Sequence, residues 1–153
     1  MSSVAATVKN VIYDKINNLS TVQCAYKHEE LQPSGFPSVS IVATGLKGEF
    51  WTTAENQRTY AYRVFVHYDI GQDLQNVAGD RMDLAEDVVT DVIDEIIRVI
   101  DDGYTLDDSL GVSILYAEAV DADYQYTELA GGWAKTAIAT IVVHTDYVIQ
   151  STI

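Results

Sequence analysis

Two histidines of this 153-residue chain each stand two positions before an aspartate, as His67 with Asp69 and His144 with Asp146. Residues two apart on a β-strand point to the same face of a sheet, so each pair would present an imidazole and a carboxylate together. If the two strands were neighbours, the four side chains would offer the ligands that zinc and related metals take. Half-exposed strand residues with ordinary polar neighbours are the simpler interpretation, and we expect no metal site.

Four aspartates bracket a turn that contains Gly103, namely Asp101, Asp102, Asp107 and Asp108. Carboxylate clusters of this kind suit calcium. An EF-hand loop placed here would need oxygen ligands at Arg98 and Ile100, which cannot supply them. A non-standard calcium site and a solvated acidic loop both fit the spacing, and the solvated loop is the simpler prediction.

The single cysteine, Cys24, stands four residues before His28. A thiol beside an imidazole is the minimal nucleophile–base pair, but nothing else in the sequence supports a dyad. The chain contains no Walker A loop and none of the patterns GxGxxG, GxSxG or HExxH. We therefore predict no catalytic centre and no cofactor, and we do not expect an enzyme.

The sequence predicts two helices. Apolar residues recur at steps of three and four over 3–18, which predicts a short N-terminal helix ending at Asn17-Asn18. The range 77–101 gives the strongest helical pattern, with a wide apolar stripe and aspartates largely off it. Gly103 is placed to end this long helix in a left-handed cap. Between the helices, 20–37 reads as a crossing loop with a short strand near 22–26, because it holds both prolines.

Strands fill the rest of the chain. Alternating and β-branched residues predict strands over 38–44, 49–53, 59–70, 112–118, 120–127 and 133–148, with 49–70 as a hairpin. The last strand is far longer than usual, so we expect it to bend or project beyond the sheet. This order predicts a single α+β domain over 1–153. Its sheet would be antiparallel or mixed, with about five to six strands, and would carry the N-terminal helix and the long acidic helix on one face.

Aromatic residues mark candidate interfaces. Phe50 and Trp51 lie at the start of the predicted hairpin, where exposed aromatic side chains often anchor a partner. Packing against the helix of the same domain is the alternative. Trp133 begins the long last strand and Tyr147 lies near its end. We assign these four residues to subunit contacts.

The charge is strongly uneven. The chain has 23 acidic and 9 basic residues, for a formal net charge of −14, and residues 77–153 carry nearly all of it. Such a balance argues against wrapping nucleic acid on an exposed surface, because phosphate binding needs lysine and arginine. One cysteine excludes an internal disulfide, the N-terminus lacks the pattern of a signal peptide, and no apolar run reaches membrane length. Solubility alone explains the acidity, and so does a surface that repels a polyanion or meets a basic partner.

The pattern as a whole resembles the tail terminator proteins of long-tailed bacteriophages. The likeness begins with the amphipathic helix over 3–18 and a loop that ends in Phe36-Pro37-Ser38-Val39-Ser40-Ile41-Val42. It continues with a polar-tipped hairpin over 48–70, a long acidic helix over 77–102 and a final group of strands. It covers nearly the whole chain as a likeness of length and element order, without a diagnostic motif.

The resemblance implies a structural virion protein. Such proteins form a hexameric ring that caps the tail tube, stops its polymerisation and offers a docking face to the head connector. They are assembled in the host cytoplasm and stay in the neck of the virion, while DNA passes through the central channel. An acidic channel would repel the phosphates of the passing genome. On this basis we expect five aspartates near the channel or its rim: Asp80, Asp83, Asp87, Asp121 and Asp123.

Two other functions stay open. One is another head–tail joining component or a tail-tube-like subunit, which would share much of this element order. The other belongs to a different class, a small soluble α+β ligand-binding module or enzyme with a pocket between the long helix and the sheet. A closed ring would favour a structural protein of the phage tail, and a monomer with a deep pocket would favour a ligand-binding module or enzyme.

Overall fold

The computed structural model describes residues 4–50, 55–103 and 114–148. In chain order, its elements are α1 (Val4–Asn17), β1 (Cys24–Tyr26), β2 (Ser38–Phe50), β3 (Glu55–Gly71), the 3₁₀ turn η1 (Leu74–Asn76), α2 (Gly79–Asp102), β4 (Ile114–Leu129) and β5 (Gly132–Val148). The predicted order of helices and strands is therefore confirmed.

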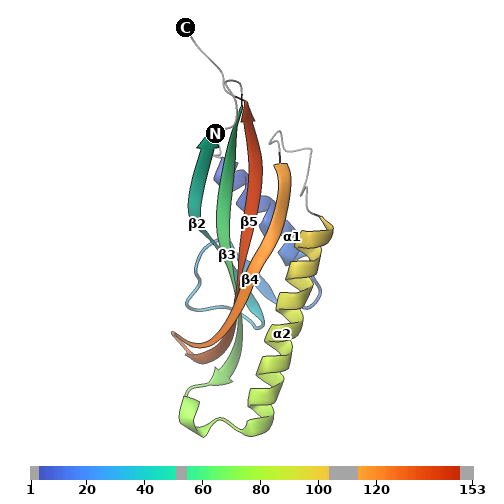
Figure 1. The fold of residues 1–153 in the computed structure, drawn as a ribbon. Helices are drawn as coiled ribbons and strands as arrows, with labels where there is room; N and C mark the ends of the chain where they lie inside the picture. Colours follow the sequence, from blue (N-terminus) through green and yellow to red (C-terminus); the bar gives the residue numbers. More distant parts are fainter. Residues whose placement is uncertain (1–3, 51–54, 104–113, 149–153) are drawn as a thin grey trace.

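The five strands form one mixed sheet in the order β1-β2-β3-β5-β4 (Figure 1). The short β1 runs parallel to β2, and every other neighbouring pair is antiparallel. Apolar side chains of α1, α2 and one face of the sheet share a single hydrophobic core. This is the predicted α+β fold, with both helices packed on the sheet. We call the other side of the sheet the open face.

The helices follow the predicted spacing. In α1 the buried positions are Val8, Val11, Ile12 and Ile16, all on one stripe. The Tyr62 hydroxyl on β3 donates a hydrogen bond to the Ala5 carbonyl at 2.7 Å, which ties the start of α1 to the middle of the sheet.

The end of α2 differs from the prediction. Gly103 has φ −107°, so it is not in the left-handed conformation. Its N–H instead donates to the Val99 carbonyl at 3.1 Å and continues the helical hydrogen bonding by one residue.

The sheet is built from fewer and longer strands than predicted. The predicted strands 38–44 and 49–53 are not separated at Gly45 and Gly48, because β2 continues through both glycines to Phe50 and pairs with β3 along its length. Likewise 112–118 and 120–127 are not two strands but one, β4. In each case a β-bulge absorbs the irregularity, since the pairing register skips Thr44 in β2 and Val120 in β4.

The last strand does not project. β5 spans Gly132–Val148, and β3 pairs with it from one end to the other while β4 pairs with it over most of its length. Its neighbours are equally long, so the whole sheet extends and curves together (Figure 1). Of the two predicted outcomes, the strand therefore bends and does not project, because its partners are long enough to pair with it.

Small residues shape the contact between α2 and the sheet. The side chains that β4 and β5 turn toward the helices include Ala117, Ala137 and Ala139, all buried in the core. Opposite them, α2 contributes larger side chains, among them Ile93 and Ile96, which are fully buried. Alanines on the strands let the helix approach closely, and its isoleucines fill the space.

Candidate functional site: the acidic flank and the open face

Exposed carboxylates gather along one flank of the molecule. We define the acidic flank as the outward side of α2 together with β4. Its exposed acids are Asp80, Asp83, Glu86, Asp87, Asp91, Asp94, Asp101, Asp102, Glu118, Asp121, Asp123 and Glu128. Only two basic residues, Arg81 and Arg98, lie on these two elements. The flank therefore carries a strong and nearly uncompensated negative field.

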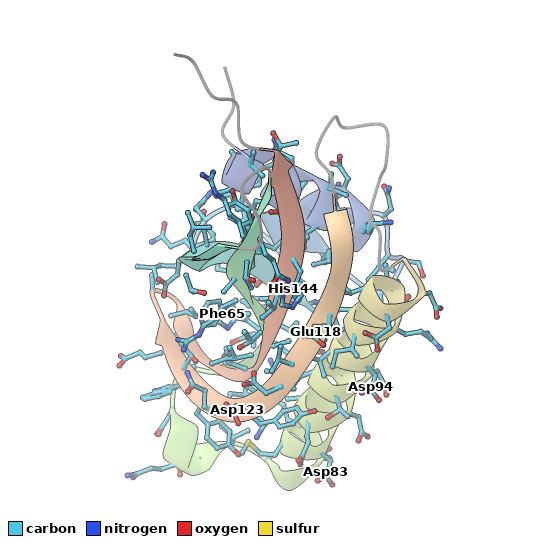
Figure 2. All side chains as sticks on the ribbon, turned by 45° about the horizontal axis from the view of Figure 1, so that its top comes forward. Phe65, Asp83, Asp94, Glu118, Asp123 and His144 are labelled. Carbon is cyan, nitrogen blue, oxygen red and sulfur yellow. The ribbon has the colours of Figure 1, made fainter. Side chains whose placement is uncertain are left out.

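The five aspartates predicted for a channel all belong to this flank. Asp80, Asp83 and Asp87 are exposed on the first half of α2. Asp121 and Asp123 are exposed on β4, and their register with Thr140 and Ile138 of β5 places them on the open face. Figure 2 shows Asp83 and Asp94 on the helix and Asp123 on the strand beside it. The two groups thus lie at the same edge of the molecule, on opposite sides of the sheet.

The charge on α2 lowers the stability of that helix. Asp83, Asp87 and Asp91 follow one another at steps of four residues, and Asp80 and Asp94 extend the row at steps of three. Like charges at these spacings are neighbours on a helix surface and repel by a few tenths of a kcal/mol per pair. The acidic row is therefore a cost to folding, which is a reason to ask what function it serves.

We expect Asp87→Lys to raise the free energy of unfolding by about 1 kcal/mol, because it replaces two repulsive pairs, with Asp83 and Asp91, by two attractive ones. Urea denaturation of both proteins at low salt measures the difference. Repeating the measurement at 1 M salt is the control, since screening should remove most of the gain. An unchanged or lower stability at low salt would contradict the repulsion.

A row of polar side chains crosses the open face. Glu118 of β4 lies 3.2 Å from Nε2 of His144 on β5, and Nδ1 of His144 lies 3.1 Å from the Thr59 hydroxyl on β3 (Figure 2 labels Glu118 and His144). The three residues join three strands through side chains. The order hydroxyl–imidazole–carboxylate is that of a catalytic triad, but the residues come from a regular strand register, and none of them lines the pockets at the β4–β5 turn or along α2. We interpret the row as cross-strand stabilisation.

A second polar row lies under the loop that joins β1 to β2. His67 is buried, and its Nδ1 lies 2.7 Å from the Thr136 hydroxyl on β5. Ser38, opposite His67 on β2, is fully buried, and its hydroxyl has no hydrogen-bond partner among the described residues. Hydrogen bonds join this loop to β2 and to the β4–β5 turn. The Glu30 N–H donates to the Ser40 hydroxyl, and the Ala130 N–H donates to the Leu31 carbonyl.

Burial makes His67 a source of acid sensitivity. It lowers the pKa of His67 to about 4, from an ordinary 6.5, because the charged imidazolium is disfavoured away from water. The unfolded chain therefore binds a proton between pH 6.5 and pH 4 that the folded chain does not. The corresponding stability is complete above pH 6.5 and is lost as the pH falls toward 4.

We expect the wild-type protein to lose about 2 kcal/mol through His67 between pH 8 and pH 5. The variant His67→Gln lacks this contribution, so its stability should fall less over the same range. Urea midpoints at pH 8, 7, 6 and 5 for both proteins measure the difference, in which the other titrating groups cancel. Parallel pH profiles for the two proteins would show that His67 is not the sensitive group.

The register excludes the metal site considered from the sequence. β3 and β5 are indeed neighbours, but His67 lies opposite Thr136 and His144 opposite Thr59, eight residues apart along the strand. Asp69 instead forms an ion pair with Arg81, with 3.3 Å between the Asp69 Oδ2 and the Arg81 Nη2. Among the described residues, no three His, Cys, Asp or Glu side chains gather to hold a metal ion. The calcium alternative depends on Asp107 and Asp108, which lie outside the described residues.

Cys24 and His28 do not form a dyad. The Cys24 thiol lies 3.2 Å from the Ser34 hydroxyl. The His28 ring bonds through Nε2 to Glu30 at 2.8 Å and contacts the Tyr26 ring. Each group therefore has its own partner in the crossing loop, and these contacts do not join the thiol to the imidazole.

One of the four aromatic residues assigned to contacts can be placed. Trp133 is half-buried at the β4–β5 turn, where it lines a pocket of about 290 Å³ together with Leu31, Phe36 and Leu129. Trp51 lies outside the described residues, as do the side chains of Phe50 and Tyr147. Their role in subunit contacts stays a prediction.

Sequence reasoning missed the pairing of Glu118 with His144 and the exposed apolar residues of β4. Val120, Tyr124 and Tyr126 are all more than two-fifths exposed on that strand. Their exposure depends on β4 being the edge of the sheet, and the sequence carries no signal for strand order beyond the length of the connections.

None of the helices in the described ranges is both long enough and apolar enough to cross a membrane. Comparison of the chain with protein-family models and with curated proteins returned no match.

Proposed function

We propose that this protein is a structural component of a phage tail: a ring-forming tail terminator that caps the tail tube, stops its polymerisation and joins the tube to the head connector. The observation that carries the proposal is the acidic flank. Twelve exposed carboxylates on α2 and β4 face only two arginines on the same elements.

The physical argument concerns the passage of DNA. A duplex carries one negative charge per about 1.7 Å of its axis, so basic walls would retain it and acidic walls repel it. A ring of copies repeats the acidic flank around its axis and adds the fields of all copies. On this proposal Asp80, Asp83, Asp87, Asp121 and Asp123 lie at the channel or its rim, and DNA is a passing cargo rather than a ligand.

The remaining parts of the proposal follow from the resemblance in sequence pattern. The ring is a hexamer, and its partners are the tail tube protein and the connector or stopper protein of the head. Assembly takes place in the host cytoplasm, and the finished protein stays in the neck of the virion. Contacts through Phe50, Trp51, Trp133 and Tyr147 would hold copies or partners in place.

One observation favours the alternative class, a ligand-binding module. The pocket of about 290 Å³ beside Trp133 is lined mostly by apolar residues, together with Gln32 and Asp69, and approaches the size of a small-molecule site. It lies between the crossing loop and the β4–β5 turn, not between α2 and the sheet as that alternative assumed. The acidic flank has no part in it, so the pocket leaves the main feature of the surface unexplained.

Native mass spectrometry and negative-stain microscopy of the purified protein, alone and with tail tubes, test the proposal. We expect closed rings, or rings on one end of each tube, and an arrest of tube elongation when the protein is added to growing tubes. Incorporation along the tube would favour a tube-like subunit, and binding to the connector alone would favour another joining component. A monomer that neither forms rings nor binds tubes would refute the proposal.

A further inference from the structure

We infer that neighbouring copies join through the two edges of the sheet, with β4 of one copy pairing antiparallel with residues 41–50 of β2 in the next. The inference rests on the proposed ring, because it describes how the copies in such a ring touch. Of the four aromatic residues considered above it includes only Phe50, the last residue of β2, and it makes the ring contact a continuation of the sheet.

Both edges offer unpaired backbone. β4 pairs only with β5, so its outer side has no strand partner within the described residues. β2 pairs with β3 on one side and with β1 on the other, but β1 covers only Ser38–Ser40. Long open edges of this kind are templates for another strand, and monomeric proteins usually shorten or cover them.

The strand directions suit a ring. β2 is antiparallel to β3, β3 to β5 and β5 to β4, so β4 runs opposite to β2. Copies related by rotation about an axis along the strands keep the same strand directions. The β4 edge of one copy therefore meets the β2 edge of the next in antiparallel orientation, the arrangement in which hydrogen bonds are straightest.

The two edges also bend at the same level. One row of the sheet runs from Ala43 through Tyr62 and Ile141 to Ala119. The bulged residues, Thr44 on β2 and Val120 on β4, lie directly next to the two ends of this row. A bulge bends its strand and fixes register, so a neighbouring copy presents a bend where this copy has one.

Apolar side chains are exposed on these same edges. Leu46 on β2 is 61% exposed and Val120 on β4 is 57% exposed, and the row register places both within two residues of the shared bend. Tyr124 and Tyr126 extend the exposed apolar surface along β4. Pairing with a second copy would remove this surface from water, which is favourable in proportion to the area buried.

Charge selects head-to-tail over symmetric pairing. β4 carries four acids and no base, whereas β2 carries Lys47 and Glu49 and is neutral. Two β4 strands paired with each other would set four acids against four, and opposed like charges destabilise a sheet. Pairing β4 with β2 avoids this repulsion. The contact is therefore heterologous, as a ring requires.

Proline at the two bulges tests the inference. Thr44→Pro and Val120→Pro each place a residue without an N–H, and with a bulky ring, on one free edge, at a position that the pairing inside the chain skips. We expect each variant alone to be monomeric under conditions in which the wild type assembles. Mixed together, they should form a one-to-one dimer and nothing larger, because each retains one competent edge. Native mass spectrometry with and without tail tubes measures the number of copies in each assembly.

Side-chain variants test the same edges in case a proline variant fails to fold. Leu46→Lys and Val120→Lys change exposed side chains without altering the backbone, and each should lower self-association at least tenfold even if a proline variant fails to fold. Leu84→Lys, at an exposed apolar position on α2, is the control and should assemble as the wild type does. Circular dichroism confirms that each variant is folded.

The outcomes separate this inference from the function. Rings formed by all edge variants would overturn the edge contact and leave the terminator proposal standing. Dimers of Thr44→Pro alone would show symmetric β4 pairing and would overturn the inference as well. A wild-type protein that stays monomeric even on tail tubes would refute both.

Discussion

Truncating Ile96 to alanine should lower the free energy of unfolding by about 3 kcal/mol, roughly a 150-fold change in the folding equilibrium. Ile96 is fully buried on α2, in the core shared with Ala117, Ala137 and Ala139 of the strands. These alanines are too small to move into the space that the lost methyl groups leave, so the cavity stays open. The cost therefore lies well inside the range for large-to-small changes, although alanine itself favours helix formation slightly.

The neighbouring residue supplies the control. Ile97 is only half-buried, one position along the same helix. Ile97→Ala makes the same chemical change with the same gain in helix propensity, so the difference between the two variants isolates burial. We expect Ile97→Ala to cost about 1 kcal/mol or less. Urea denaturation of the three proteins measures the effect, and equal losses for the two variants would contradict the assigned packing.

Helices were the part of the fold that the sequence predicted well. Apolar residues at steps of three and four placed both helices to within two residues, because this spacing directly encodes a buried stripe. The end of α2 was less predictable. A glycine after a helix permits a left-handed cap but does not require one, and Gly103 instead continues the helical hydrogen bonding to Val99.

Strand boundaries were harder to predict from the sequence, because they depend on which neighbouring strand pairs with each segment. Gly45 and Gly48 suggested a break in the chain, yet β2 continues through them since β3 pairs with it there. The prediction also separated 112–118 from 120–127, at the place where the alternation of polar and apolar residues changes phase. The structure shows that a phase change inside one strand is a bulge.

The candidate site also has a part that the sequence predicts and a part that it does not. Net charge and its concentration after residue 77 come directly from composition, and the structure places twelve of those acids on one flank. Contacts across the sheet were not predictable. Whether His144 meets His67 or Glu118 is decided by strand order and register, which depend on pairing between segments far apart in the sequence.

Reversing charge on the acidic flank should turn a surface that repels DNA into one that binds it. In the variant Asp83→Lys/Asp87→Lys/Asp123→Lys, three substitutions of two charges each bring the net charge from −14 to −8. If the flank faces the channel, each ring then presents lysines to passing DNA. For three phosphate contacts the affinity should fall about 40-fold between 50 and 200 mM salt. Fluorescence anisotropy of a labelled duplex, with rings or capped tubes, measures this.

A control of equal net charge decides whether position matters. Asp14→Lys, Asn17→Lys, Asn18→Lys and Glu29→Lys together also give −8, and all four residues are exposed on α1 or in the segment between α1 and β2, outside α2 and β4. We expect this control to bind DNA far more weakly than the flank variant, because a charge outside the channel meets the duplex only at the screened distances of the outer surface. Equal binding by both variants would mean that the protein responds to net charge alone. The acidic flank would then serve solubility, and the cost of its repulsive aspartates to α2 would need no channel to explain it.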